Sequence, residues 1–139
     1  MTVSPRPGTP DRPRADDRRP RVVLFDVFET MLQVDALGAR FVDVGRPAHE
    51  WELFFTRTLR DGMALTLAGS TPPFGDVARA ALRTTTGHTL SDEALDHVLA
   101  GFAHLPPHPD VEPALQALAL ARVPTYAFTH GSPGTACDA

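Results

Sequence analysis

Two short apolar segments, far apart in the chain, constrain the fold most. Residues 22–25 read Val-Val-Leu-Phe, and residues 123–128 read Val-Pro-Thr-Tyr-Ala-Phe. The first segment is apolar throughout, which is typical of a strand buried on both faces of a parallel sheet. The second has its proline at the start, where a strand loses no ladder hydrogen bond. About 100 residues separate the two strands, so they indicate one βαβ unit with a long insertion and an α/β fold class.

The sequence between these strands has the apolar spacing of amphipathic helices. Over residues 50–67 the apolar side chains recur at steps of three and four: Trp51, Phe54, Phe55, Leu59 and Met63. Two further helices are expected over residues 74–82 and 91–102, the second with Ser91 as its N-cap. Asp110 is the expected N-cap of a fourth helix, which leads into the second strand.

The composition excludes several classes of protein. The 139 residues carry a formal net charge of −4, whereas a general nucleic-acid-binding protein is normally basic. No apolar run approaches the roughly 20 residues that span a bilayer, so we expect no membrane segment. The single cysteine forms neither an internal disulfide nor a zinc cluster, which favours a cytoplasmic protein. All 13 basic residues are arginine, so a reaction on this chain has no lysine to use.

The first 20 residues differ from the rest of the chain. They hold five prolines, five arginines and three aspartates, with little apolar surface to bury. Such a segment does not offset its ordering entropy, so we expect a disordered tail over residues 1–20. The tail also lacks the apolar stretch of a secretory signal.

Side chains with reactive groups follow both predicted strands. Asp26 comes directly after the first strand, with Thr30 four residues later, and Thr129 comes directly after the second strand. Ligands of open α/β sheets bind beyond the carboxyl ends of the strands, and a right-handed crossover places these two ends side by side. A carboxylate beside hydroxyls and free backbone amides suits nucleophilic attack on a bound anion. Each residue alone is more often a turn former, but their order and spacing indicate a site.

The residues around both strand ends resemble the motifs of a known superfamily. Residues 22–32, Val-Val-Leu-Phe-Asp-Val-Phe-Glu-Thr-Met-Leu, resemble the first motif of the haloacid dehalogenase (HAD) superfamily, and residues 128–133, Phe-Thr-His-Gly-Ser-Pro, are similar to its second. The pattern is closest to the type II 2-haloacid dehalogenases. This resemblance implies a HAD-like Rossmannoid core with an incomplete parallel sheet over residues 21–35 and 106–139. It also implies an inserted α-helical cap over residues 36–105.

The resemblance also implies roles for the residues at the strand ends. Asp26 would be the covalent nucleophile, and Thr30 would support the first-motif loop. Thr129, with the turn residues His130 and Gly131, would bind the substrate anion. The family usually has an asparagine at the position of His130, where a neutral imidazole can still donate a hydrogen bond.

Phe28 favours one branch of the superfamily. Its phosphatases usually carry a second aspartate two positions after the nucleophile, which donates a proton to the departing alkoxide. Phe28 stands at that position, and a halide leaves as an anion without a proton. Phe28 therefore favours dehalogenase chemistry, with its ring as an aromatic wall of the substrate-binding site. No metal or other cofactor is expected, and magnesium only if the chain is a phosphatase.

Two positions of the first motif and the cap depart from the family pattern. Glu29 stands where the family often has glycine. The dehalogenases carry a Trp-Arg pair early in the cap, whose arginine binds the substrate carboxylate, whereas Trp51 is followed here by Glu52. Arg57 or Arg60, one or two helical turns later, would have to replace that arginine.

The family's third and fourth motifs are expected beyond the second strand. They supply a lysine or arginine that holds the nucleophile, and acidic residues near it. The sequence ends ten residues after Thr129 and has no arginine after Arg122. The resemblance therefore implies a C-terminally truncated hydrolase with little or no turnover.

Three hypotheses about function follow. The first is a HAD-like hydrolase that acts on the carbon–halogen bond of a small anionic 2-haloacid through an ester of Asp26. The second is a HAD-type phosphatase. The third is a non-catalytic fragment, in which an unfinished sheet leaves a strand edge and apolar surface for a partner or a second copy, giving a homo-oligomer.

Overall fold

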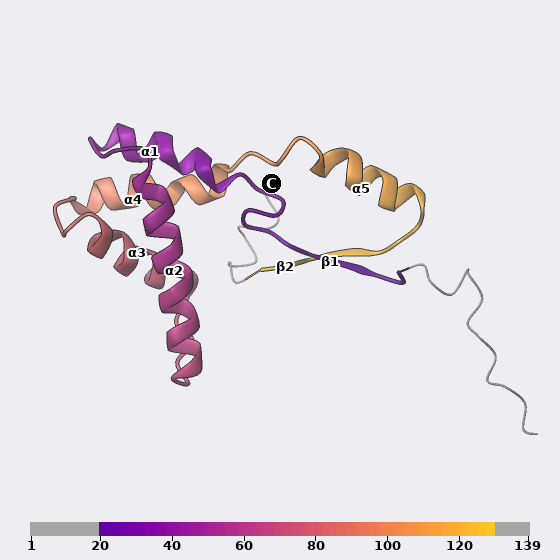
Figure 1. The fold of residues 1–139 in the computed structure, drawn as a ribbon, viewed down its shortest axis with the longest axis horizontal. Helices are drawn as coiled ribbons and strands as arrows, with labels where there is room; N and C mark the ends of the chain where they lie inside the picture. Colours follow the sequence, from indigo (N-terminus) through magenta and orange to yellow (C-terminus); the bar gives the residue numbers. More distant parts are fainter. Residues whose placement is uncertain (1–19, 130–139) are drawn as a thin grey trace, which may run out of the picture.

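The computed structural model describes residues 20–129. Its elements fall into two groups (Figure 1): helices α1 to α4 lie at one end, and a two-stranded sheet with helix α5 lies at the other. The tail predicted to be disordered, and the turn after Thr129, lie outside the described residues. No helix in the described part of the chain has the length and apolar character needed to cross a membrane.

The sheet consists of the two predicted strands. β1 (Val23–Asp26) and β2 (Thr125–Phe128) pair in parallel, with Asp26 opposite Phe128 at their carboxyl ends. The long insertion between them holds five α-helices. The α/β class and the parallel pairing predicted from the sequence are therefore confirmed.

Only one face of this sheet is covered by a helix. Phe25 is half-buried and shares a hollow with residues of α5 (Val111–Leu120). The opposite face is bare, because Leu24, Tyr126 and Phe128 are 60–67% exposed. The prediction that the first strand is buried on both faces is therefore wrong for the described residues, since a helix covers one side alone.

Most predicted helices form, with small changes at their ends. α2 (Glu50–Leu67) has the predicted bounds, and α3 (Phe74–Thr85) runs three residues further than predicted. α4 (Asp92–Ala100) ends earlier and continues as a 3₁₀ turn. Ser91 is confirmed as its N-cap, since its hydroxyl accepts a hydrogen bond from the Ala94 amide at 3.3 Å. Asp110 is confirmed as the N-cap residue of α5, although its side chain forms no capping hydrogen bond.

One helix had no counterpart among the predicted elements. A 3₁₀ turn over Val34–Ala36 leads into α1 (Leu37–Asp43). Two turns of helix are too short to show a clear apolar period in the sequence. α1 nevertheless anchors the core, because Leu37 and Phe41 are fully buried.

The hydrophobic core lies among the helices rather than against the sheet. It joins α1 to α4 through buried aromatic and aliphatic side chains: Phe28, Phe41, Phe54, Phe55, Leu82, Leu95, Val98 and Phe102. Phe28 belongs to the loop after β1, so this core reaches back to the strand end. Residues 31–33 and 106–108 connect the two groups of elements, and the amides of Gln33 and His108 bond across them, each at 2.9 Å.

Replacing Gly101 by alanine is expected to destabilise the helical core. A Cβ atom at Gly101 would lie 2.7 Å from Leu37 Cδ2 and 3.1 Å from Arg40 Cγ, and Leu37 is fully buried. Overpacking of this kind costs about 1–3 kcal/mol of unfolding free energy, which chemical denaturation would measure. Gly75→Ala is the matched control, because nothing lies within 4 Å of a Cβ there. Equal stability of the two variants would contradict this packing.

Candidate active site

Two of the predicted site residues meet at the carboxyl end of the sheet. Asp26 is the last residue of β1 and pairs with Phe128, so Thr129 directly follows its neighbour in the adjacent strand. Asp26 is exposed and Thr129 is half-buried. The strand pairing thus places a carboxylate next to the start of the second-motif turn. His130 and Gly131 lie outside the described residues, and their assignment stays a prediction.

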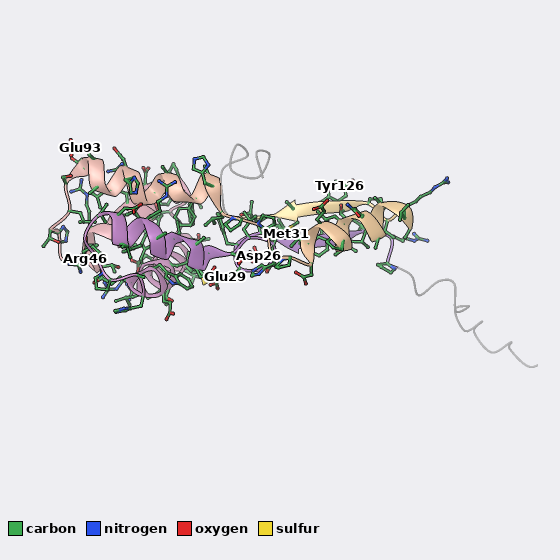
Figure 2. All side chains as sticks on the ribbon, turned by 90° about the horizontal axis from the view of Figure 1, so that it is seen from above. Asp26, Glu29, Met31, Arg46, Glu93 and Tyr126 are labelled. Atoms are coloured by element: carbon green, nitrogen blue, oxygen red, sulfur yellow. The ribbon has the colours of Figure 1, made fainter. Side chains whose placement is uncertain are left out.

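The loop after Asp26 is closed by its own backbone. The amides of Met31 and Leu32 both donate to the Val27 carbonyl, at 2.9 and 3.0 Å, and the Glu29 amide donates to the Leu32 carbonyl at 2.9 Å. This turn places Thr30 Oγ1 3.5 Å from Asp26 Oδ2, at the long limit of a hydrogen bond. The turn therefore keeps Thr30 beside the carboxylate, and Figure 2 shows Asp26, Glu29 and Met31 together between the two groups of elements.

Glu29 adopts a backbone conformation that favours glycine. Its φ angle is +61°, in the left-handed region where a Cβ atom meets the following carbonyl oxygen. This geometry gives a physical reason for the glycine that the resembling motif often has at this position. The Glu29 side chain is exposed, so its charge is solvated rather than directed into a closed site.

Glu29→Gly is expected to stabilise the chain by about 0.5–1 kcal/mol. Relief of the left-handed strain, about 1–2 kcal/mol, exceeds the extra chain entropy that glycine loses on folding. Glu29→Ala separates strain from charge, because it removes the carboxylate and keeps the Cβ atom. Denaturant midpoints that rise for both variants alike would show that charge, not backbone strain, limits stability here.

Phe28 is buried in an aromatic cluster rather than open at the strand end. Its ring stacks on Phe74 at 5.5 Å between centroids and meets the edges of Phe102 at 5.4 Å and Phe55 at 6.1 Å. Only 8% of Phe28 is exposed. The cluster, from three helical segments, was not identified from the sequence. The only sequence signal was the number of phenylalanines, eight in all.

The two arginines proposed to bind a substrate carboxylate are each bonded to another residue of the helices. Arg57 Nη1 donates to Thr85 Oγ1 at 3.2 Å. Thr85 ends α3, whereas Phe74, which stacks on Phe28, begins it. These ends are about 16 Å apart at 1.5 Å per residue, so the Arg57 guanidinium bonds at the end of α3 that is remote from Phe28. Arg60 pairs with Asp61 at 2.8 Å, and this hydrogen bond and charge raise the pKa of Arg60.

No arginine or histidine among residues 20–129 forms an ion pair with Asp26. Arg46 binds Glu50 through two hydrogen bonds, at 2.9 and 2.6 Å. Figure 2 shows Arg46 at the end of the helical group remote from Asp26. The described residues also contain no group of three or more His, Cys, Asp or Glu side chains that could hold a metal ion.

A small hollow adjoins the first-motif loop on the side of α5. It has a volume of about 90 Å³ and is lined by residues of the first-motif loop and of the start of α5: Phe25, Thr30, Met31, Asp110, Val111, Ala114 and Leu115. Its wall is mostly apolar, and Thr30 and Asp110 are its two polar residues. Sequence reasoning identified Thr30 but not Met31, whose position depends on the loop closing on the Val27 carbonyl.

The chain resembles known proteins in its structure rather than in its sequence. No protein-family model and no curated protein sequence matches the chain. Among solved structures, an L-2-haloacid dehalogenase from Xanthobacter autotrophicus superposes with a TM-score of 0.73 at 24% identity, over 85% of this chain and 49% of the other. The L-2-haloacid dehalogenase RSc1362 gives 0.77 at 26% identity, over 84% and 55%. A further dehalogenase gives 0.76 at 23% identity, over 86% and 55%.

The three matches cover similar shares of this chain and of the other chains. The chain spans about half the length of the solved structures it matches, while most of the chain takes part in each match. The described residues include the strand that ends at Asp26, the inserted helices and the second parallel strand. The described residues therefore have the HAD-like fold of the L-2-haloacid dehalogenases.

Proposed function

We propose that this chain carries the nucleophilic half of a 2-haloacid dehalogenase, with Asp26 as the nucleophile. The observation that supports this most is the position of Asp26. It is exposed at the carboxyl end of β1 and pairs with Phe128, which directly precedes Thr129. The fold shared with the L-2-haloacid dehalogenases supports the same chemistry. The substrate class is a small carboxylic acid with a halogen on its second carbon.

The first step of this reaction requires little beyond a carboxylate that is positioned next to the halogen-bearing carbon. An Asp26 oxygen attacks the halogen-bearing carbon, a carbon–oxygen ester bond forms, and the carbon–halogen bond breaks with its electron pair leaving on the halide. The halide takes no proton, so neither a general acid nor a metal is needed. The buried Phe28 ring, at the position of the phosphatase acid, is compatible with this step and supplies no proton.

The second step is expected to fail on the 139-residue chain alone. Hydrolysis of the ester needs a positioned water and a group that stabilises the oxyanion. Among the described residues no cation is paired with Asp26, and Arg57 is bonded to Thr85. We therefore expect the ester to accumulate, with at most one halide released per chain.

Counting chloride against chains tests this function. The full chain is incubated with an excess of 2-chloropropionate, and free chloride is measured over time. We expect a slow rise to about one chloride per chain and then a plateau. Continued release would contradict the block at hydrolysis, and no release would contradict Asp26 as nucleophile. Magnesium-dependent hydrolysis of p-nitrophenyl phosphate by the same sample would instead support the phosphatase.

A further inference from the structure

The face of the sheet that α5 does not cover is a continuous apolar patch. Side chains alternate between the two faces along a strand, and residues that pair across two strands share a face. Leu24 pairs with Tyr126, and Phe128 lies two residues beyond Tyr126, so these three side chains point to the same side. All three are 60–67% exposed, and Figure 1 shows α5 on the other side of the strands. We call this patch of Leu24, Tyr126 and Phe128 the bare face.

The dimensions of the bare face suit one α-helix. Parallel sheets normally have helices on both faces, because the connections between their strands are helical. Two strands lie about 5 Å apart and a helix is about 10 Å across, so one helix covers both strands. β1 and β2 are each four residues long, which is roughly 13 Å of strand and corresponds to about nine residues of helix. A short amphipathic helix therefore fits the bare face.

The 139 residues do not supply a suitable helix for this face. Helices α1 to α4 bury their apolar sides in their own core, and α5 lies against the opposite face. The residues outside the described range, 1–19 and 130–139, contain five prolines and only two large aliphatic side chains, Met1 and Val3. In the solved structures that superpose on this chain, the shared fold is joined to about as much polypeptide again. The occupant is therefore expected to be a polypeptide outside these 139 residues.

The charges at the two ends of the sheet give this helix a direction. Arg21 and Arg122 are exposed just before β1 and β2, whereas Asp26 and Glu29 are exposed at the carboxyl end of β1 and beyond it. The N-terminus of a helix carries a partial positive charge and its C-terminus a partial negative charge. A helix that begins beside Asp26 and ends beside the arginines meets opposite charges at both ends. α5 runs in this direction on the other face, since it begins beside Thr30 and ends shortly before β2.

We infer that the bare face binds an amphipathic helix of a polypeptide outside these 139 residues, with the N-terminus of that helix beside Asp26. The apolar side of the helix covers Leu24, Tyr126 and Phe128. The inference uses only the charge and the position of Asp26, so it stands independently of the nucleophilic role proposed above.

An apolar groove in the helical group is the competing place for such a helix. It has a volume of about 620 Å³ and lies between α2 and α3, where Leu59, Met63 and Phe74 are among its lining residues. The lining contains no charged residue, so the groove does not distinguish the two ends of a helix. The bare face does, and the groove belongs to the other group of elements. An experiment that resolves single residues therefore separates the two places.

Nuclear magnetic resonance of the full ¹⁵N-labelled chain tests the inference. The probe is a stapled helical peptide of about 12 residues with leucine at i, i+3, i+4 and i+7, and a peptide of the same composition in scrambled order is its control. We expect saturable shifts of the amides of β1 and β2 with the probe alone. A nitroxide label at the N-terminus of the probe should broaden the amides of Val27 and Glu29. A label at its C-terminus should broaden those of Arg21 and Val123.

Leu24→Arg is expected to weaken binding of the probe by about tenfold or more, because an arginine beneath an apolar helix loses hydration. Leu120→Arg is the matched control and should leave binding unchanged, since Leu120 is 87% exposed but belongs to α5. Circular dichroism checks that both variants are folded. Phe128→Arg, at the other end of the bare face, provides the same test if Leu24→Arg does not fold.

Three results would overturn the inference. Shifts confined to α2 and α3 would place the helix in the groove, and no saturable shift at all would leave the bare face without this occupant. A C-terminal label that broadened Val27 would show that the helix runs the other way. Shifts of the strand amides that depended on the concentration of the chain alone would show that a second copy covers the face.

Discussion

Replacing Asp26 by asparagine is expected to abolish chloride release from 2-chloropropionate. The amide keeps the shape of the side chain and removes the anionic oxygen that attacks carbon, so the step has no nucleophile. Asp26 ends β1 and is exposed to an incoming substrate. The expected change is from about one chloride per chain to none above the blank, read by ion chromatography after prolonged incubation.

The neighbouring carboxylate provides the control. Glu29 is exposed and lies in the same loop, beyond the end of β1 at Asp26 and with a left-handed backbone. Glu29→Gln should therefore release as much chloride as the unmodified chain. If Asp26→Asn retained chloride release while Glu29→Gln lost it, the nucleophile would be assigned to the wrong carboxylate.

Phe102→Ala is expected to lower the free energy of unfolding by about 3–5 kcal/mol. Phe102 is 7% exposed, and its ring lies against Phe28 and Phe74 at 5.4 Å and against Phe54 at 6.0 Å. Its loss would leave a cavity at the point where the first-motif loop joins the helical core. Since domains are stable by only about 5–15 kcal/mol, this change would remove a large share.

Burial, not residue type, causes this expected loss. Phe128 provides the same substitution at a position that is 67% exposed on the bare face of the sheet. Phe128→Ala should change stability by less than about 1 kcal/mol. Urea unfolding of both variants measures the difference, and similar midpoints would show that the aromatic cluster is not the core of this chain.

Much of the fold could be predicted because its signals are local. The apolar run before Asp26 and the run before Thr129 are strands, and the apolar spacing over residues 50–67 gave the bounds of α2. The pairing of the two strands followed from the handedness of βαβ connections. These predictions depend on periodicity and chain direction, which a single sequence contains.

The rest depends on contacts that no local pattern contains. Whether β1 is covered on its second face depends on which elements are present, and Leu24 is exposed there. The direction of Arg57 depends on Thr85, which is 28 residues away. Phe28 was identified as an aromatic group near the nucleophile, but its burial depends on rings from α2 and α3 and from the 3₁₀ turn after α4.

The position of the ester on the chain tests the central claim most directly. The full chain is incubated with 2-chloropropionate, digested under acidic conditions that preserve esters, and mapped by tandem mass spectrometry. The account predicts one added 2-propionate group, attached to Asp26 at the end of β1. A group attached to another carboxylate, or an unmodified Asp26 after chloride has been released, would contradict it.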